Sequence, residues 1–396
     1  GPVRDLLLGQ ENLDLDLTVE GDGLRFAERL AGRLGARLKT HPRFGTAWLH
    51  LPGGPKLDVA TARTEHYERP GALPRVRPSR LKEDLYRRDF TINAMALRLN
   101  ADAFGMLVDF FGGREDLNHG LIRVLTSNSF SEDPTRIFRA VRFEQRYGFR
   151  IEPDTERYLR HAVSRDLISR VSLPRIFDEL RLMLREDAPH KGLVRLADFR
   201  VLGWVHPKLA DGPPPREAFE RIWDALAFAV LFMDEEIDRA DLHLMILLDG
   251  LDVRETETFA TRFKLPGRLR AVLMTQKTAG DTLRRRLRRL RRPRPSRLAD
   301  ILADLPPEVL LVEMARAEDP RIARWIHRYL AEWRHVRPML TGKDLRKKGI
   351  PPGPVYGRLL AGLRAARLDH PLMTRADEDR YVRRFGKTRQ TAKTGC

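Results

Sequence analysis

Two acidic residues stand one position apart near the start of the chain. Asp14 and Asp16 lie in ENLDLDLTVEG, where apolar residues alternate with polar ones. This alternation predicts a strand over residues 13–19 that buries the face carrying Leu13, Leu15 and Leu17. Because residues two apart in a strand share a face, both carboxylates point to the other side. Two like charges so close favour a bound cation, and magnesium prefers such oxygen ligands.

Spacing alone does not decide this interpretation, because a second D-x-D pair occurs at Asp377 and Asp379 in a chain with 55 acidic residues. Two neighbours support it. Gly1 and Arg4, in GPVRDLLLG, predict a turn whose backbone amides and guanidinium meet a phosphate. Asp58, in KLDVATAR, offers a third carboxylate if its strand lies beside the first. Such groups suit metal-assisted phosphoryl transfer.

The block RRDFTINAMA, residues 87–96, allows two interpretations. It reads as a helix start with Asp89 or Thr91 as the N-cap. It also places Arg87 or Arg88 where a guanidinium can hold phosphate or ribose, with Asn93 inside an apolar run.

A third block, EDPTRIFRAVRF at 132–143, predicts a helix that begins near Asp133 and Pro134. Arg136, Arg139 and Arg142 recur every third residue along one flank, without matching acids nearby in the sequence. We expect them to meet phosphates or bases rather than carboxylates. Asp133 can accept from an exocyclic amino group and Arg136 can donate to a ring nitrogen, so together they suit the pairing edge of cytosine or adenine.

The elements that carry these residues fall into two regions. Up to residue 125, strand and helix signals alternate: a helix over LRFAERLAGRL, strands over FGTAWLHL and KLDVATA joined by the turn PGGP, then LVDFFGG and LIRVL. From Glu132 onward helical periodicity dominates and we expect no strand. The fold class is therefore α+β: a small mixed-sheet head followed by an all-helical remainder.

Composition narrows the class of protein. The chain has 396 residues, long enough for two to four domains, and its only cysteine is Cys396. No apolar run approaches the roughly 18 residues that span a bilayer, so we expect a cytoplasmic protein. The net charge of +18 suits a polyanion such as nucleic acid, although arginine usage in a GC-rich genome is an alternative explanation. Because the sequence begins with Gly1 and not methionine, we expect it to lack the natural start.

Two basic segments stand out in the second half. LRRRLRRLRRPRPSR at 283–297 keeps leucines at helical spacing, and LTGKDLRKKGIPPGPVYGRLL spans 340–360. The first is either a solvated face or an RNA contact. The candidate RNA-binding residues are Arg284, Arg285, Arg288, Lys343 and Lys347.

The ordered motifs GPVRDLLLG, DLDLTVEG, RRDFTINAMA, DFFGGREDL and EDPTRIFRAVRF resemble those of the class II tRNA nucleotidyltransferases, a family that includes CCA-adding enzymes and bacterial poly(A) polymerases. The resemblance is strong over about residues 1–200. It implies a nucleotidyltransferase head at 1–125, a helical neck at 126–195, a helical body at 196–292 and a helical RNA-binding tail at 293–396.

The resemblance also implies roles for particular residues. Asp14 and Asp16 match the magnesium-binding pair, and Asp58 is a weaker third catalytic candidate. The segment HYERPGALPRV resembles a flexible loop that helps the site switch from CTP to ATP. The implied nucleotide-binding residues are Gly1, Arg4, Arg88, Asp89, Asn93, Glu132, Asp133, Arg136, Arg139 and Arg142, of which Glu132, Asp133 and Arg136 match the protein template for the incoming base.

The implied activity is Mg²⁺-dependent addition of CCA, or its terminal A, to the 3′ end of tRNA from CTP and ATP, with release of pyrophosphate. The motif SFSEDPTRIFRAVRFEQRYGF is similar to the A-adding members, and PGALP argues against a CC-only enzyme. A poly(A) polymerase, a CC-adding enzyme, a non-catalytic RNA-binding protein and a small-molecule nucleotidyltransferase are the alternatives. No membrane partner is expected, and the oligomeric state stays open.

Overall fold

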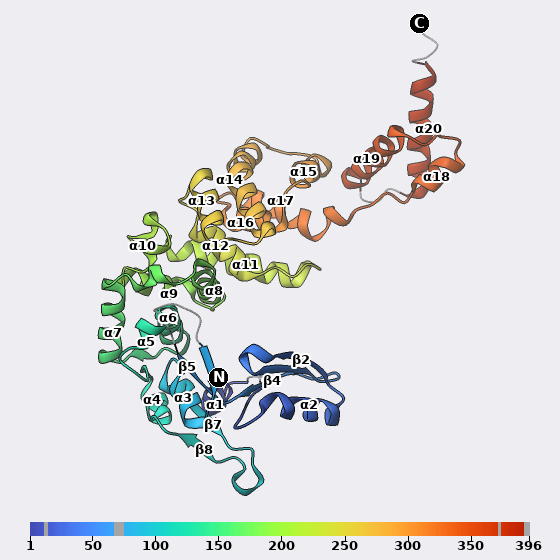
Figure 1. Cartoon of the computed structure of the whole chain (residues 1–396). Helices are drawn as coiled ribbons and strands as arrows, with labels where there is room; N and C mark the ends of the chain where they lie inside the picture. Colours follow the sequence, from blue (N-terminus) through green and yellow to red (C-terminus); the bar gives the residue numbers. More distant parts are fainter. Residues whose placement is uncertain (12–14, 67–74, 371–373, 392–396) are drawn as a thin grey trace. The chain divides into compact units, whose positions relative to one another are not determined.

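The computed structural model describes residues 1–11, 15–66, 75–370 and 374–391 (Figure 1). The chain divides into two units, Gly1–Pro213 and Pro214–Cys396. Both halves are rich in helices, and every described strand belongs to the first unit. The finer division into head, neck, body and tail remains a prediction. No helix of the described ranges is long and apolar enough to cross a membrane.

In its described residues, the first unit has ten strands and ten α-helices. The strands are β1 (Leu15–Val19), β2 (Arg37–His41), β3 (Thr46–His50), β4 (Lys56–Thr61), β5 (Arg63–His66), β6 (Arg75–Pro78), β7 (Met95–Leu97), β8 (Leu107–Asp109), β9 (Leu121–Ile122) and β10 (Arg150–Ile151). The helices are α1 (Pro2–Leu7), α2 (Gly23–Leu34), α3 (Leu81–Tyr86), α4 (Gly113–His119), α5 (Ser129–Glu132), α6 (Arg136–Tyr147), α7 (Pro153–Ser164), α8 (Leu173–Leu184), α9 (Pro189–Asp198) and α10 (Leu202–Val205).

A four-stranded mixed sheet, in the order β1-β4-β3-β2, forms the centre of the head. β1 runs parallel to β4, whereas β3 is antiparallel to both β4 and β2. The predicted PGGP turn joins β3 to β4 as a hairpin, which the structure confirms. The small mixed-sheet head expected from the sequence is therefore present.

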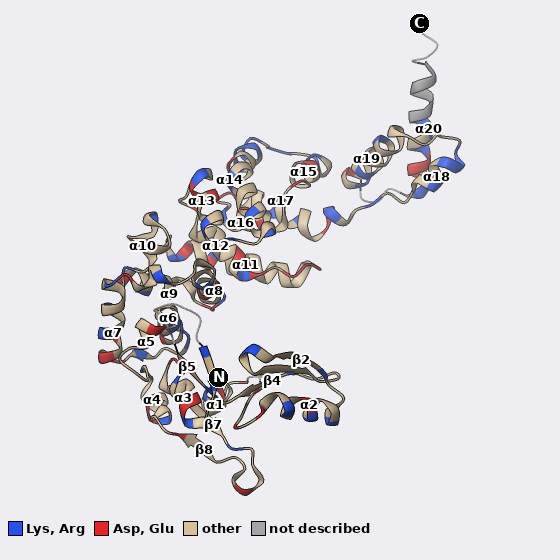
Figure 2. Cartoon of the chain, in the orientation of Figure 1, with Lys and Arg blue, Asp and Glu red and all other residues tan. Residues whose placement is uncertain are grey.

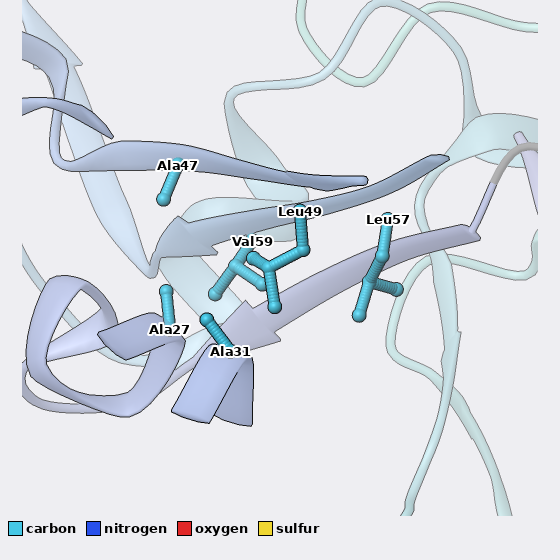
Figure 3. Packing of buried hydrophobic residues seen from close by; sticks show 6 residues of the cluster. All are labelled: Ala27, Ala31, Ala47, Leu49, Leu57 and Val59. Atoms are coloured by element: carbon cyan, nitrogen blue, oxygen red, sulfur yellow. The ribbon is translucent and has the colours of Figure 1, made fainter. Parts of the chain in front are cut away.

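Helix α2 covers one face of this sheet, and small residues let it approach closely. Its Ala27 and Ala31 pack on Ala47, Leu49, Leu57 and Val59 of β3 and β4 (Figure 3). At the start of α2, a Cβ on Gly23 would lie only 2.7 Å from Thr61 Oγ1, so this position needs glycine. The opposite face of the sheet carries the acidic residues.

The remainder of the first unit is mostly helical, with one exception to the sequence prediction. β10 pairs in parallel with β9, so the expectation of no strand after Glu132 is wrong. The pairing is only two residues long, and so short a strand leaves too little apolar alternation to detect in a sequence.

The described part of the second unit contains only helices and the turns between them. They are α11 (Arg216–Phe232), α12 (Arg239–Leu247), α13 (Val253–Arg262), α14 (Gly267–Arg288), α15 (Pro295–Leu302), α16 (Pro307–Arg316), α17 (Pro320–Ala331), α18 (Gly342–Lys347), α19 (Pro354–Asp369) and α20 (Arg375–Thr391). The connection from α14 to α15 is basic over most of its length (Figure 2). Leu283 and Leu287 of α14 are buried, which confirms the packed helical face predicted there.

Candidate active site

Asp16 and Asp58 occupy paired positions of neighbouring strands. β1 and β4 run parallel, with Asp16 opposite Asp58. The strand of Asp58 therefore lies beside the first strand, which was the condition for Asp58 to offer a third carboxylate. Leu57 and Val59 face α2, so alternation turns Asp58 to the other face. Leu17 likewise packs toward α2 and leaves Asp16 beside Asp58. Asp14 and Leu13 lie outside the described residues.

Not all of the predicted leucine face is buried. Leu15 begins β1 with 45% of its surface exposed, so its predicted burial is wrong. The apolar cluster under the sheet is formed by α2, β3 and β4, with Leu17 and Val19 packing at its edge. Leu15 stands at the start of the strand, outside this set, and the alternation in the sequence does not show where the covering helix ends.

Asp58 has an oxygen available for a further partner. Its Oδ2 accepts from Lys56 Nζ at 2.9 Å, whereas the buried Oδ1 has no hydrogen-bond partner among the described residues. Gly1 lies next to Asp16, since a Cβ built on it would stand 3.4 Å from Asp16 Oδ2. The described residues contain no cluster of three or more potential metal ligands, and Asp14 lies outside them.

Arg4 lies in a helix and not in the predicted turn. Residues Pro2–Leu7 form α1, and Arg4 is buried there with 6% of its surface exposed. Its guanidinium bonds Asp5 and the side-chain oxygen of Asn93, and it lies 4.9 Å from the centre of the Tyr147 ring. The turn prediction is therefore wrong, because proline at the first helical position starts a helix here.

The RRDFTINAMA block holds a buried carboxylate and not a helix start. Thr91–Asn93 form a single 3-10 turn that leads into β7, so the helix-start interpretation is wrong. Asp89 instead accepts from Phe90 N and Asn93 Nδ2 at 2.9 Å each, and from Arg139 Nε at 2.8 Å. Burial alone would raise the pKa of Asp89, but the charge of Arg139 and these hydrogen bonds outweigh it and hold the pKa at about 2.

Acidic partners do meet Arg139 and Arg142 of α6, contrary to the prediction. Arg139 pairs with Asp89 and Glu179, and Arg142 pairs with Glu186 at 3.4 Å and Glu179 at 3.9 Å. Glu179 belongs to α8 and Glu186 follows it, some 40 residues away in sequence. Local spacing along α6 therefore could not reveal them. Burial raises the pKa of Glu179, although both arginines oppose this shift.

The predicted template residues are held by separate partners. Arg136 donates to Ser129 Oγ at 2.6 Å and to the backbone oxygen of Arg87 at 2.8 Å. Asp133 accepts from Arg175 Nη2 at 2.8 Å and from the backbone of Thr135. Glu132 is partly buried, and this burial raises its pKa. The first contacts of Asp133 and Arg136 are therefore within the protein, which fixes both side chains before a ligand arrives.

The sequence did not single out the acids that hold Arg87 and Arg88. Asp84 is fully buried and accepts from Arg87 at 2.9 Å and from Arg88 at 3.4 Å. Glu65 of β5 also accepts from Arg87 at 2.8 Å. The spacing of three and four residues from Asp84 to the arginines was the available signal. Glu65 gave none, because it lies on another element.

The candidate RNA-binding residues of the second unit differ in the ion pairs that they form. Arg284 pairs with Asp281 and with Glu313, whose side chain is only 1% exposed. Arg288 pairs with Glu318 on the surface, whereas Arg285 contacts only Thr282 Oγ1 in the described structure, at 3.5 Å. Lys343 and Lys347 are exposed on α18.

We expect Arg284→Met to lower the free energy of unfolding and to have little effect on RNA affinity. Burial raises the pKa of Glu313, and without Arg284 this carboxyl keeps only the longer contact of 3.7 Å to Arg316. The cost is about 1–3 kcal/mol in the free energy of unfolding, measured by urea titration. Arg285→Met is the control and should leave stability unchanged. This assignment would be contradicted if Arg284→Met kept the wild-type stability and bound RNA more weakly than Arg285→Met does.

Comparison with known proteins agrees with this geometry. Residues 1–123 match the family model described as poly A polymerase head domain, and residues 148–212 match the probable RNA and SrmB-binding site of polymerase A. The A-adding tRNA nucleotidyltransferase of Geobacter sulfurreducens is 41% identical over 97% of this chain, which spans only 44% of that relative's length. The A-adding enzyme of Halalkalibacterium halodurans is 32% identical, with 98% of this chain and 88% of the relative covered.

The solved structures give the same result. The apo form II structure of a CCA-adding enzyme superposes with a TM-score of 0.77 and 37% identity, covering 96% of this chain and 89% of that one. Together these matches define the first unit as carrying a nucleotidyltransferase head, followed by helices. The chain belongs to the class II tRNA nucleotidyltransferase and bacterial poly(A) polymerase family.

Proposed function

We propose that this chain transfers nucleotides to the 3′ end of tRNA in the cytoplasm, with the terminal adenylate of CCA as its main product and pyrophosphate as the leaving group. The observation that carries the proposal is the in-register pair of Asp16 and Asp58, in a first unit that also holds the Asp133–Arg136 motif. The names of the two relatives described above favour adenylate addition over cytidylate addition.

The acidic residues suit a divalent cation. The buried Oδ1 of Asp58, without a hydrogen-bond partner among the described residues, and the adjacent Asp16 are hard oxygen donors of the kind that Mg²⁺ takes. We propose that Asp14 and Asp16 hold the ion, with Asp58 as a third ligand. When bound, the ion supplies charge neutralisation for the triphosphate and lowers the pKa of the attacking hydroxyl.

The protein's own part in the reaction is to position the reactants. Asp133 would accept from the exocyclic amine of the incoming base, and Arg136 would donate to its ring nitrogen. Ser129, Arg175 and the carbonyl of Arg87 hold these two side chains in place. Preorganisation of this kind lowers the barrier because orientation is fixed before the chemical step.

The other predicted nucleotide contacts remain proposals, and their residues differ in how exposed they are. Arg88 is partly exposed and can meet a ribose, whereas Arg4, Asp89 and Asn93 are buried and linked to one another. We propose that Arg4, Asp89 and Asn93, together with Arg139 and Arg142, support the nucleotide-binding residues from the protein interior. Arg285, Arg288, Lys343 and Lys347 are the proposed RNA contacts of the second unit.

The test is a substrate panel. Transcripts that end at the discriminator base, in C and in CC are each incubated with labelled ATP alone and with labelled CTP alone. We expect one adenylate on the CC end and little CTP incorporation on any end. Incorporation of both nucleotides would make the protein a CCA-adding enzyme, CTP incorporation alone a CC-adding one, and long adenylate tails a poly(A) polymerase. No incorporation with retained RNA binding would indicate a non-catalytic protein.

A further inference from the structure

A row of four side chains crosses the open face of the central sheet. Asp16 pairs with Asp58, Asp58 pairs with Trp48, and Trp48 pairs with Lys39, one residue from each strand in spatial order. Residues in register share a face, so this row lies opposite the face covered by α2. The carboxylates occupy one end of the row, and an aromatic ring with a cation occupies the other.

Trp48 lies between two lysines. Lys39 Nζ is 5.1 Å and Lys56 Nζ is 5.0 Å from its ring centre, and the His41 ring lies at 5.6 Å. Lys56 also pairs with Asp58. The aromatic ring is therefore joined to the proposed catalytic carboxylates through a single lysine.

On β2 and β3, away from Asp58, the residues around Trp48 are basic. β2 reads RLKTH and β3 reads TAWLH, so neither strand has an acidic residue. Arg37, His41 and His50 lie at alternate positions with Lys39 and Trp48, on the same face, and all three are exposed. Trp48 itself is partly exposed and lies outside the apolar cluster under the sheet. The packing of α2 on the sheet does not need an indole at this position.

An aromatic ring flanked by cations is the usual platform for single-stranded nucleic acid, because a base stacks on the ring while the cations neutralise its phosphates. Adjacent strands are separated by about 4.8 Å, so Trp48 lies only about 10 Å across the sheet from Asp16. A short single strand spans that distance. Asp133 and Arg136 are already assigned to the incoming base, which leaves this platform for the other reactant.

We propose that Trp48, Lys39 and Lys56 bind the single-stranded 3′ end of the RNA that is to be extended, with one base stacked on the indole. This inference rests on the proposed function and adds to it the path of the RNA strand toward the carboxylates. It predicts a contact that depends on an unpaired 3′ tail and not on the RNA helix.

The experiment measures RNA binding without nucleotide, using the full chain and a labelled RNA hairpin that either has or lacks a short 3′ tail. Trp48→Leu should weaken binding of the tailed hairpin about tenfold and leave the blunt hairpin within twofold. Trp48→Phe keeps a ring and should stay within about threefold of wild type. Lys39→Ala should lower the salt slope for the tailed RNA by roughly 0.7, as for one phosphate contact with a single strand.

Arg33→Ala removes one positive charge from the exposed side of α2, on the other face of the sheet, and is the matched control for Lys39→Ala. Equal effects of these two variants would overturn the proposal. So would an unchanged affinity of Trp48→Leu for tailed RNA, or a raised KM for ATP with RNA affinity unchanged. If Trp48→Leu does not fold, the comparison of Lys39→Ala with Arg33→Ala in binding tailed RNA decides whether the proposal holds.

Failure of the proposed function gives a different result. If the wild-type protein binds tailed RNA through Trp48 but incorporates no nucleotide, the RNA-binding site is supported and the proposed activity is refuted. If the wild-type protein incorporates adenylate and Trp48→Leu binds tailed RNA normally, the proposed activity is supported and the RNA-binding site is refuted.

Discussion

Asp16→Ala reduces nucleotide incorporation by roughly a thousandfold or more while RNA affinity stays within about twofold. The expectation follows from the pairing of Asp16 with Asp58 on the open face of the sheet, where two carboxylates can share one divalent cation. Losing one of them removes charge that neutralises the triphosphate in the transition state. RNA affinity depends on basic residues and on Trp48, all of which this substitution leaves in place.

Single-turnover incorporation of labelled ATP measures the first effect, and titration of labelled RNA measures the second. Glu28→Ala removes an exposed acid from α2, on the opposite side of the sheet, and should behave as wild type. We expect Asp14→Ala to resemble Asp16→Ala. Full activity in Asp16→Ala would refute the assignment of this face as the catalytic site.

Arg139→Met should destabilise the first unit by about 3 kcal/mol. Asp89 is almost fully buried, and Arg139 donates to it at 2.8 Å from 50 residues further along the chain. Removing the arginine leaves a buried carboxylate without its counter-charge, the costly case for a buried ion pair. Hydrogen exchange of the α6 amides reports the unfolding free energy of this unit separately from the second unit.

The pH dependence has a definite sign. Asp89 has a pKa of about 2 in the folded protein against 3.8 ordinarily, so its stabilising contribution is full above about pH 4 and is lost as the pH falls toward 2. In Arg139→Met, burial loses its strongest opposing charge, and the pKa of Asp89 rises above its wild-type value. The stability difference between the variant and the wild type should therefore shrink as the pH is lowered from neutral.

A double-mutant cycle isolates the pair. Asp89→Asn in the Arg139→Met background removes the unpaired charge and should recover much of the lost stability, because the amide oxygen can still accept from Phe90 N. Strictly additive effects of the two substitutions would show that the ion pair contributes little.

The sequence was a good guide to the strands and helices in which apolar residues recur at a regular spacing. Alternation of apolar residues, with the PGGP turn, predicted the strands on which Asp16 and Asp58 lie, and the structure places those strands side by side. The periodic leucines of 283–290 likewise predicted a packed helix. Both patterns span fewer than about ten residues, over which side-chain direction follows from secondary structure alone.

Contacts between distant segments could not be predicted in the same way. Glu179 in α8 and Glu186 just after it neutralise Arg139 and Arg142, and Asp133 meets Arg175. The periodicity of α6 shows only which residues share a flank, not what packs against it. The same limit explains the missed role of Glu65. The assignment of Arg4 to a turn has a local cause instead, because Pro2 starts a six-residue helix there.

The central claim is tested most directly by incubating the wild-type protein with Mg²⁺, labelled ATP and a transcript that ends in CC, and by sequencing the 3′ end of the product. We expect one added adenylate with an equal amount of pyrophosphate, and no addition by Asp16→Ala. An unchanged 3′ end in the wild-type reaction would contradict the proposed function.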